Sequence, residues 1–180
     1  MAKERGVRIT DVILDVAVDD DLKTQFVQEA DPSVDVDIAR YLKRPETIVG
    51  ASDAGAHVRT FCGAGNTSYV LSKWVREEGV LTLEEAVKRM TLEEAQALGF
   101  QGRGLLKEGY AADVVVFDPE QVSRSAAYMV NDLPGGGERV YHDAHGIDHV
   151  IVNGRLAVRD GNLTGELAGQ VIRSQAAPPK

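Results

Sequence analysis

A short run of β-branched and small residues, TIVGAS at positions 47–52, constrains the fold of this chain more than any other segment. It has the composition of a strand buried on both faces, and such a strand needs a neighbour on each side. The first hundred residues offer one convincing strand of this kind and at most one weak one, at 22–30. The pattern therefore predicts that this part of the chain belongs to a larger layer than its own residues complete.

Helical patterns lie on both sides of this run. The sequence predicts helices over the ranges 9–20, 34–43 and 67–78, and then two short helices in tandem that end near Gly99. Thr67 or Ser68 is the expected cap of the third helix. Thr82 and Glu85 have the spacing of a capping box, and the same spacing returns at Thr91. Two i,i+4 ion pairs are expected here, Glu84–Lys88 and Glu85–Arg89.

Beyond residue 100 the sequence changes to β character. A strand is expected over 112–119, and HVIVNGRLAV at 149–158 predicts a hairpin whose Asn-Gly turn is of type I′. The segment 131–140, which contains three consecutive glycines, is expected to be a loop. The tail after about residue 164 is weakly patterned. The chain thus divides into a helical part and a β part.

Composition excludes several classes of function. A net charge of −8 over 180 residues argues against nucleic-acid binding, because phosphates must be neutralised by cations. The sequence has no apolar window of about 18 residues, and its start does not have the pattern of a secretory signal. The single cysteine, Cys62, allows no internal disulfide and is expected to be a small buried apolar residue. We therefore expect a cytoplasmic protein with no membrane partner.

The residues after the buried run are candidates for chemistry. Asp53 follows the run directly, and in (β/α)8 barrels the active site lies at the carboxyl ends of the strands. A carboxylate there can take a proton from a water molecule. The small residues nearby leave room for a substrate, and His57 could orient the carboxylate. The alternative is an ordinary turn in which Asp53 bonds its own backbone, and the stretch alone leaves both interpretations open.

The stretch GASDAGAH at 50–57 resembles the last-strand motif of the amidohydrolase superfamily, and most closely its N-acyl-D-amino-acid deacylase (D-aminoacylase) branch. Three further segments resemble that family in the same order: the helical stretch 68–100, the glycine turns and strand GRGLLKEGYAADVVVFDPEQV, and the hairpin region from DLPGGGERV to residue 165. The resemblance extends from about residue 6 to 173.

The resemblance implies a metal-dependent hydrolase, usually with zinc, that cleaves the amide of N-acyl-D-amino acids. The expected fold is α/β plus β: residues 1–103 as the last units of a (β/α)8 TIM-type barrel, 104–173 as the C-terminal share of a small β-sandwich, and 174–180 as a tail. Asp53 would act as general base and then as general acid, and it is a weak candidate metal ligand. Ser52, Gly55 and His57 would shape the site.

The sequence departs from the family in two ways. The family usually has a proline near Glu93 and Glu94, which bears on helix geometry. More importantly, the family's metal is held by an H-x-H and by further residues from earlier strands, whereas this sequence contains no H-x-H. We therefore expect the isolated chain to bind no metal and to be inactive.

Two alternatives remain open. The chain could be a non-catalytic assembly domain that pairs with itself or with an N-terminal partner chain. Within the superfamily, the substrate could be a cyclic amide, as in dihydroorotases and hydantoinases.

Other polar residues are weaker candidates. His142, His145 and His149 fall within eight positions, but the intervening Gly146 and the strand after it argue against convergence on zinc. Arg59 and Arg76 have the charge to bind a substrate carboxylate, although solvated surface is the better interpretation of both.

Overall fold

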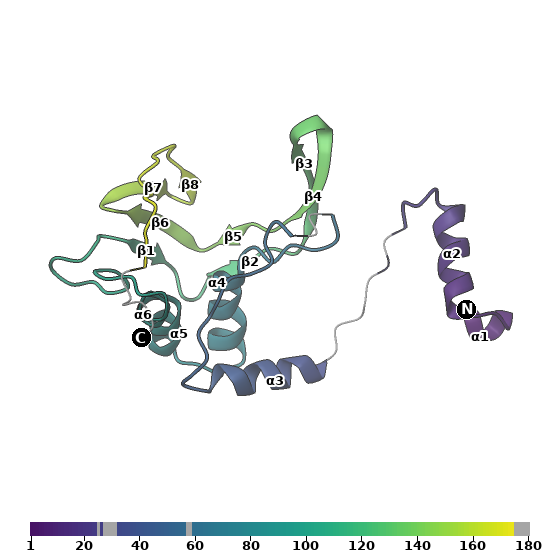
Figure 1. The fold of residues 1–180 in the computed structure, drawn as a ribbon, viewed down its shortest axis with the longest axis horizontal. Coiled ribbons are helices and arrows are strands. Elements are labelled where there is room, and N and C mark those ends of the chain that lie inside the picture. The colour runs from purple at the N-terminus through teal and green to yellow at the C-terminus, as the bar shows by residue number, and fades with distance from the viewer. Residues whose placement is uncertain (25, 27–31, 57–58, 175–180) are drawn as a thin grey trace. The chain divides into compact units, whose positions relative to one another are not determined.

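The computed structural model describes residues 1–24, 26, 32–56 and 59–174. The chain divides into two compact units, Met1–Pro32 and Ser33–Lys180, and each is described by itself. The first unit contains helices α1 (Ala2–Arg5) and α2 (Ile9–Asp19) (Figure 1). Helix α2 confirms the helix predicted over 9–20. Residues 22–24 form no strand, and most of the weak strand considered at 22–30 lies outside the described residues.

Helix α3 (Pro32–Leu42), which lies in the second unit from Ser33 onward, confirms the helix predicted over 34–43. A second helical run joins α4 (Asn66–Tyr69) to the π-helical segment η1 (Val70–Glu77). Its N-cap is Gly65, so the predicted cap at Thr67 or Ser68 is wrong. The run ends just before Gly79, which adopts a left-handed φ of +57°.

The third helical run shows one correct and one incorrect prediction of capping. It comprises α5 (Leu83–Lys88), η2 (Arg89–Glu93) and α6 (Glu94–Ala97), one after another. The Thr82–Glu85 capping box is confirmed by both of its hydrogen bonds, of 2.9 and 3.2 Å. Thr91 instead lies inside the run, where its hydroxyl donates to the carbonyl of Val87 over 2.7 Å. A hydroxyl satisfied by the preceding turn starts no new helix, so two tandem helices are not formed.

The main sheet is antiparallel with strand order β1-β6-β7-β8. Its strands are β1 (Val114–Phe117), β6 (Ile147–Val152), β7 (Arg155–Arg159) and β8 (Asn162–Leu163). The hairpin predicted at 149–158 is confirmed as β6–β7. Its turn residues Asn153 and Gly154 have φ angles of +49° and +79°, as a type I′ turn requires.

The loop predicted at 131–140 is wrong. Strands β3 (Tyr128–Leu133) and β4 (Gly137–Tyr141) pair antiparallel and are joined by the 3-10 turn η3 (Pro134–Gly136). The proline and glycines form only the tight turn, while the flanking residues pair across the strands. At the base of this hairpin, β2 (Ser123–Arg124) pairs with β5 (Ala144–His145).

The core of the second unit joins its helices to its sheet. The buried apolar residues of this cluster are Leu42, Val49, Val70, Leu71, Trp74, Leu81, Ala86 and Val122. Phe117 of β1 and Ile147 of β6 pack against it. The backbone approaches closely at Gly146, where a Cβ would lie 2.5 Å from the nitrogen of Val122. This contact, with a left-handed φ of +68°, explains the glycine before β6.

Candidate functional site

The segment 47–53 has an apolar side but forms no strand in the structure. Val49 is buried in the core cluster, whereas Ile48 is 39% exposed. The buried strand predicted at 47–52 is therefore wrong as a hydrogen-bonded element. A strand needs backbone partners on its edges, and no described segment pairs with this one. Val49 packs this segment into the core cluster with residues of the helices.

Asp53 stands at the end of this segment with an exposed side chain. The turn after it is closed by its backbone, because the amide of Ala56 donates to the Asp53 carbonyl over 3.0 Å. The side-chain cap comes from Ser52, whose Oγ accepts from the amide of Ala54 over 3.3 Å. Gly55 supplies the left-handed φ of +86° that the turn requires. Among the residues that the structure describes, none forms a hydrogen bond or ion pair with the Asp53 carboxylate.

The three residues predicted to shape the site have different outcomes. Ser52 and Gly55 form part of the turn that follows Asp53, and their role in shaping a substrate site stays a prediction. His57 lies outside the described residues.

At Gly63 the absence of a side chain lets the backbone lie close to the backbone of Asp53. A Cβ at Gly63 would lie 2.9 Å from the nitrogen of Asp53 and 3.1 Å from the Cβ of Ser52. A little further along, the side-chain amide of Asn66 donates to the carbonyl of Gly50 over 3.2 Å. Residues 50–54 therefore pack against the chain that leads into α4. Neither contact has a recognisable signal in the sequence, because both depend on which backbones meet.

Arg89 is a second residue whose role the sequence does not reveal. Its Nη1 donates to the carbonyls of Arg44 and Thr47, over 2.9 and 2.7 Å. The guanidinium thereby ties the helical run of α5 and η2 to the start of the segment that carries Asp53. The ion pair predicted between Arg89 and Glu85 does not form, since the Glu85 carboxylate accepts from the backbone of Thr82 instead.

The two arginines that the sequence offers for substrate binding, Arg59 and Arg76, both have partners within the chain. Nη1 of Arg76 donates to the carbonyls of Pro119 and Val122, over 2.9 and 2.8 Å, and links η1 to the segment before β2. Arg59 forms an ion pair with Glu138 of β4 at 3.2 Å. Arg76 is thus occupied by backbone, and the interpretation of it as solvated surface is wrong.

The three C-terminal histidines bond separately. Nδ1 of His142 lies 2.8 Å from the carbonyl of Ser125, and Nδ1 of His149 accepts from the amide of Asp160 over 3.3 Å. His145 lies in β5. Across the described ranges, no three His, Cys, Asp or Glu side chains gather closely enough to hold a metal ion. Cys62, predicted to be buried, is half-exposed and free.

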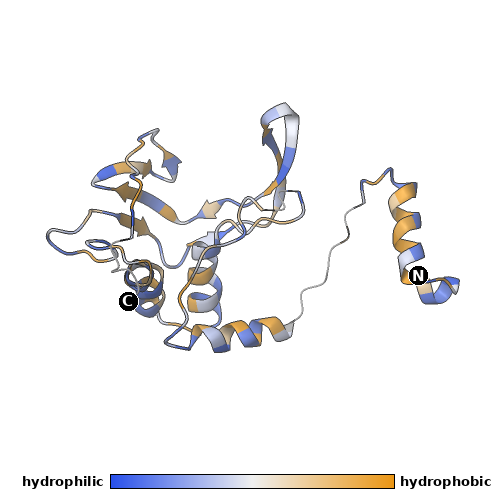
Figure 2. Cartoon of the chain, in the orientation of Figure 1, coloured by the Kyte–Doolittle hydropathy of each residue, from blue (hydrophilic) through white to orange (hydrophobic). Residues whose placement is uncertain are grey.

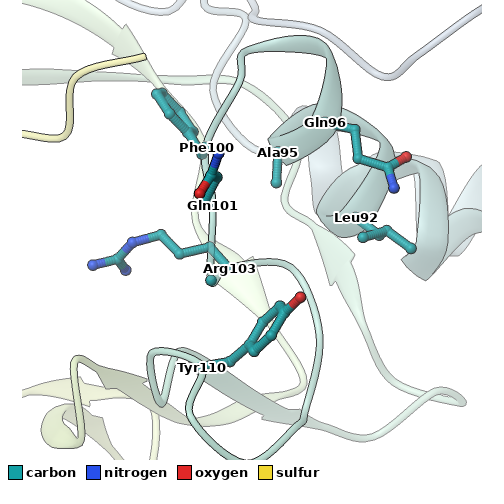
Figure 3. A pocket seen from close by; sticks show the side chains of 8 residues that line it. Leu92, Ala95, Gln96, Phe100, Gln101, Arg103 and Tyr110 are labelled. Atoms are coloured by element: carbon teal, nitrogen blue, oxygen red, sulfur yellow. The ribbon is translucent and has the colours of Figure 1, made fainter. Parts of the chain in front are cut away.

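A pocket of about 360 Å³ lies between α6 and the glycine-rich turns before β1 (Figure 3). Phe100, Arg103 and Tyr110 line it together with Gln96. Asp53, Ser52 and Gly55 do not line this pocket. The guanidinium of Arg103 is bound to Asp113 and Asn153, so its charge is already compensated. The pocket is therefore separate from the Asp53 turn, which stays the candidate site predicted from the sequence. In the part of the chain that the structure describes, no helix is long and apolar enough to cross a membrane.

Comparison with known proteins identifies the relationship. A sequence profile described as the amidohydrolase family matches residues 11–158. The N-acyl-D-aspartate deacylase of Alcaligenes xylosoxydans xylosoxydans is 37% identical over 148 residues, which are 79% of this chain and 27% of that protein. The D-aminoacylase of the same organism is 35% identical over 145 residues, 78% of this chain and 28% of that protein. The chain thus spans about a quarter of the length of these relatives.

Among solved structures, a D-aminoacylase described by the functional role of its binuclear metal centre is 36% identical. The match covers 59% of this chain and 21% of that one, with a TM-score of 0.48. Because the family profile covers most of the sequence, from the helix α2 to the strand β7, this chain belongs to the amidohydrolase family.

Proposed function

We propose that this chain supplies the Asp53 part of a metal-dependent amidohydrolase that cleaves N-acyl-D-amino acids. The observation that carries the proposal is the Asp53 turn: an exposed carboxylate, free of described partners, on a backbone held by the Ser52 cap and by Gly63. Membership of the amidohydrolase family and the names of the related deacylases supply the reaction class.

Asp53 would transfer the proton that amide hydrolysis requires. Its carboxylate takes a proton from the attacking water, whose oxygen bonds to the acyl carbon. When the carbon–nitrogen bond breaks, the same proton passes to the leaving nitrogen, because an unprotonated amide nitrogen leaves poorly. The products are a carboxylic acid and the amine of a D-amino acid. One carboxylate thus acts as general base and then as general acid.

The family resemblance also implies a metal, with zinc as the expected ion. The described residues do not fit one by themselves, because Asp53 is the one carboxylate placed at this turn and no three donors gather among the described residues. We propose that the ligands of the metal, like the remaining strands of a (β/α)8 barrel and of the small β-sandwich, come from residues outside this sequence. On this proposal the 180-residue chain alone is inactive.

Assays can separate the parts of this proposal. The DNA upstream of this reading frame should be read for an H-x-H-encoding segment, and the joined polypeptide assayed with zinc on N-acetyl-D-amino acids, their L-isomers and dihydroorotate. We expect release of D-amino acids, and a decrease in kcat of about 100-fold or more for Asp53→Asn. Turnover of dihydroorotate alone would favour the cyclic-amide class. Hydrolysis by the 180-residue chain itself would overturn its proposed inactivity.

A second candidate function is that of an assembly domain, favoured by the exposed apolar side chains of the helices. On α2, Ile9, Leu14 and Val18 are 70%, 62% and 68% exposed, and Figure 2 shows how much of this helix is hydrophobic. Apolar side chains on a helix of this unit are available to pack against another chain or another segment of the protein. Native mass spectrometry tests this candidate: a stable oligomer or a co-purifying longer chain supports it, and a monomer at micromolar concentration contradicts it.

A further inference from the structure

The β3–β4 hairpin meets the loop that carries Asp53. We call residues 53–56 and 59–65 the Asp53 loop. Nη2 of Arg59, in this loop, donates to Oε2 of Glu138 on β4 over 3.2 Å, although the two residues are 79 positions apart in sequence. Figure 1 shows the segment between α3 and α4 running toward β4. The contact brings the β-rich part of the chain to the candidate site.

The hairpin is held in one shape by bonds between its own strands. Arg139 donates twice to the carboxylate of Asp132, over 2.6 Å each, and its guanidinium stacks on the ring of Tyr141 at 4.5 Å. The rings of Tyr128 and Tyr141 meet edge to face, with centroids 6.0 Å apart. Tyr128 also donates to Asp143 over 2.8 Å. The Asp132–Arg139 and Tyr128–Tyr141 contacts join β3 to β4 and stabilise the hairpin.

A second set of contacts joins the end of the Asp53 loop and the following helix α4 to β2, at the base of the hairpin. The guanidinium of Arg124, on β2, lies 4.1 Å from the ring centroid of Tyr69 in α4. A Cβ at Gly65 would lie 3.1 Å from the Cβ of Arg124. The Asp53 loop thus contacts β4 through Arg59 and lies close to β2 at Gly65.

We propose that the β3–β4 hairpin positions the Asp53 loop, and that Glu138 is a positioning residue which acts through Arg59. The inference rests on the proposed function in one respect, namely that Asp53 transfers the proton. It adds that the β-rich part of the chain forms one wall of the site. Removing the Glu138 charge should loosen the loop without unfolding the hairpin, since the Asp132–Arg139 bonds stay intact.

Hydrogen exchange measured by mass spectrometry on the purified chain tests this without any need for activity. Compared with wild type, Glu138→Gln should speed amide exchange in residues 59–64 by about two- to fivefold, the effect of losing a partly exposed ion pair. Exchange in the β6–β7 hairpin should not change. Glu166→Gln, which removes the 3.0 Å pair with Arg155, is the matched control and should leave residues 59–64 unaffected.

Charge reversal distinguishes positioning from a local defect. The double variant Arg59→Glu with Glu138→Arg should restore slow exchange in the loop. Unchanged loop exchange in Glu138→Gln, or no rescue by the double variant, overturns the proposal. In a catalytically active form of the protein, Glu138→Gln should lower kcat by a similar two- to fivefold factor, with rescue by the double variant. Faster exchange with an unchanged kcat overturns the positioning role and leaves the proposed function standing.

Discussion

Asn153 and Asp113 lie 40 positions apart in sequence, and the backbone N–H of Asn153 donates to Oδ1 of Asp113 over 2.8 Å. The other carboxylate oxygen of Asp113 accepts from Arg103. Arg103 in turn donates to the side-chain oxygen of Asn153 over 2.7 Å. These three residues close a ring that joins the loop after α6 to the start of β1 and to the β6–β7 turn. The side chain of Asn153 extends it to the tail, donating to the carbonyl of Ala168 over 2.7 Å.

Replacing Asp113 by alanine should destabilise the chain by about 2–3 kcal/mol. The substitution leaves the amide of Asn153 without its acceptor and the half-buried Arg103 without its counter-charge. Urea unfolding followed by circular dichroism measures the effect. The matched control is Asp148→Ala, because Asp148 is exposed and its side chain bonds to none of the described residues. Equal stabilities of the two variants would contradict the role of the ring.

Gly63→Ala should disturb the Asp53 turn. The added methyl group would lie 2.9 Å from a backbone nitrogen, so the backbone itself must shift. We expect a loss of about 1–3 kcal/mol of stability, the usual cost of overpacking, together with faster amide exchange at residues 53–56. Gly50→Ala is the control, since no heavy atom lies within 4 Å of a Cβ at that position. If Gly63→Ala matches Gly50→Ala in both measurements, the close packing is not as described.

Thr82→Ala and Thr91→Ala should differ, although the sequence presents both residues as helix caps. Removing the Thr82 hydroxyl deletes a capping-box acceptor and should cost about 1 kcal/mol. Thr91 donates to the carbonyl of Val87 inside the helix, and alanine has the higher helix propensity, so its replacement should cost less than about 0.5 kcal/mol. Thermal unfolding of the two variants gives the comparison. A larger loss at Thr91 would indicate that a new helix does begin there.

The hairpin should lose stability in acid. The hydrogen bond that Arg139 donates to Asp132, on β3, lowers the pKa of this carboxyl group below its usual value. Desolvation raises the same pKa, but its effect is smaller. A carboxyl group whose pKa is lower in the folded state stabilises that state at every pH above its unfolded pKa, about 3.9. The stability difference between wild type and Asp132→Asn should therefore be constant from pH 5 to 8 and shrink as the pH falls below about 4. Urea unfolding of both proteins across this pH range measures the difference. A stability difference that grows as the pH falls would contradict the prediction.

Local sequence patterns were sufficient wherever an element is stabilised by its own residues. The helices α2 and α3, the Thr82–Glu85 box and the Asn-Gly turn of β6–β7 each depend on contacts within a few positions, and each was predictable. The position of Asp53 directly after an apolar segment could also be predicted, because it depends only on the order of residues along the chain. The family assignment followed from segments read in order along the chain.

Tertiary contacts decided the rest. Whether 47–53 is a strand depends on backbone partners elsewhere. Residues 134–136 form a tight turn between two strands, because the residues of β3 and β4 on either side of it pair with each other. Arg89 is within reach of Glu85 by spacing, yet it binds the carbonyls of Arg44 and Thr47. The same is true of Arg59, whose partner Glu138 lies in a different part of the chain. Contacts between distant segments follow from three-dimensional proximity, which the periodicity of a sequence does not encode.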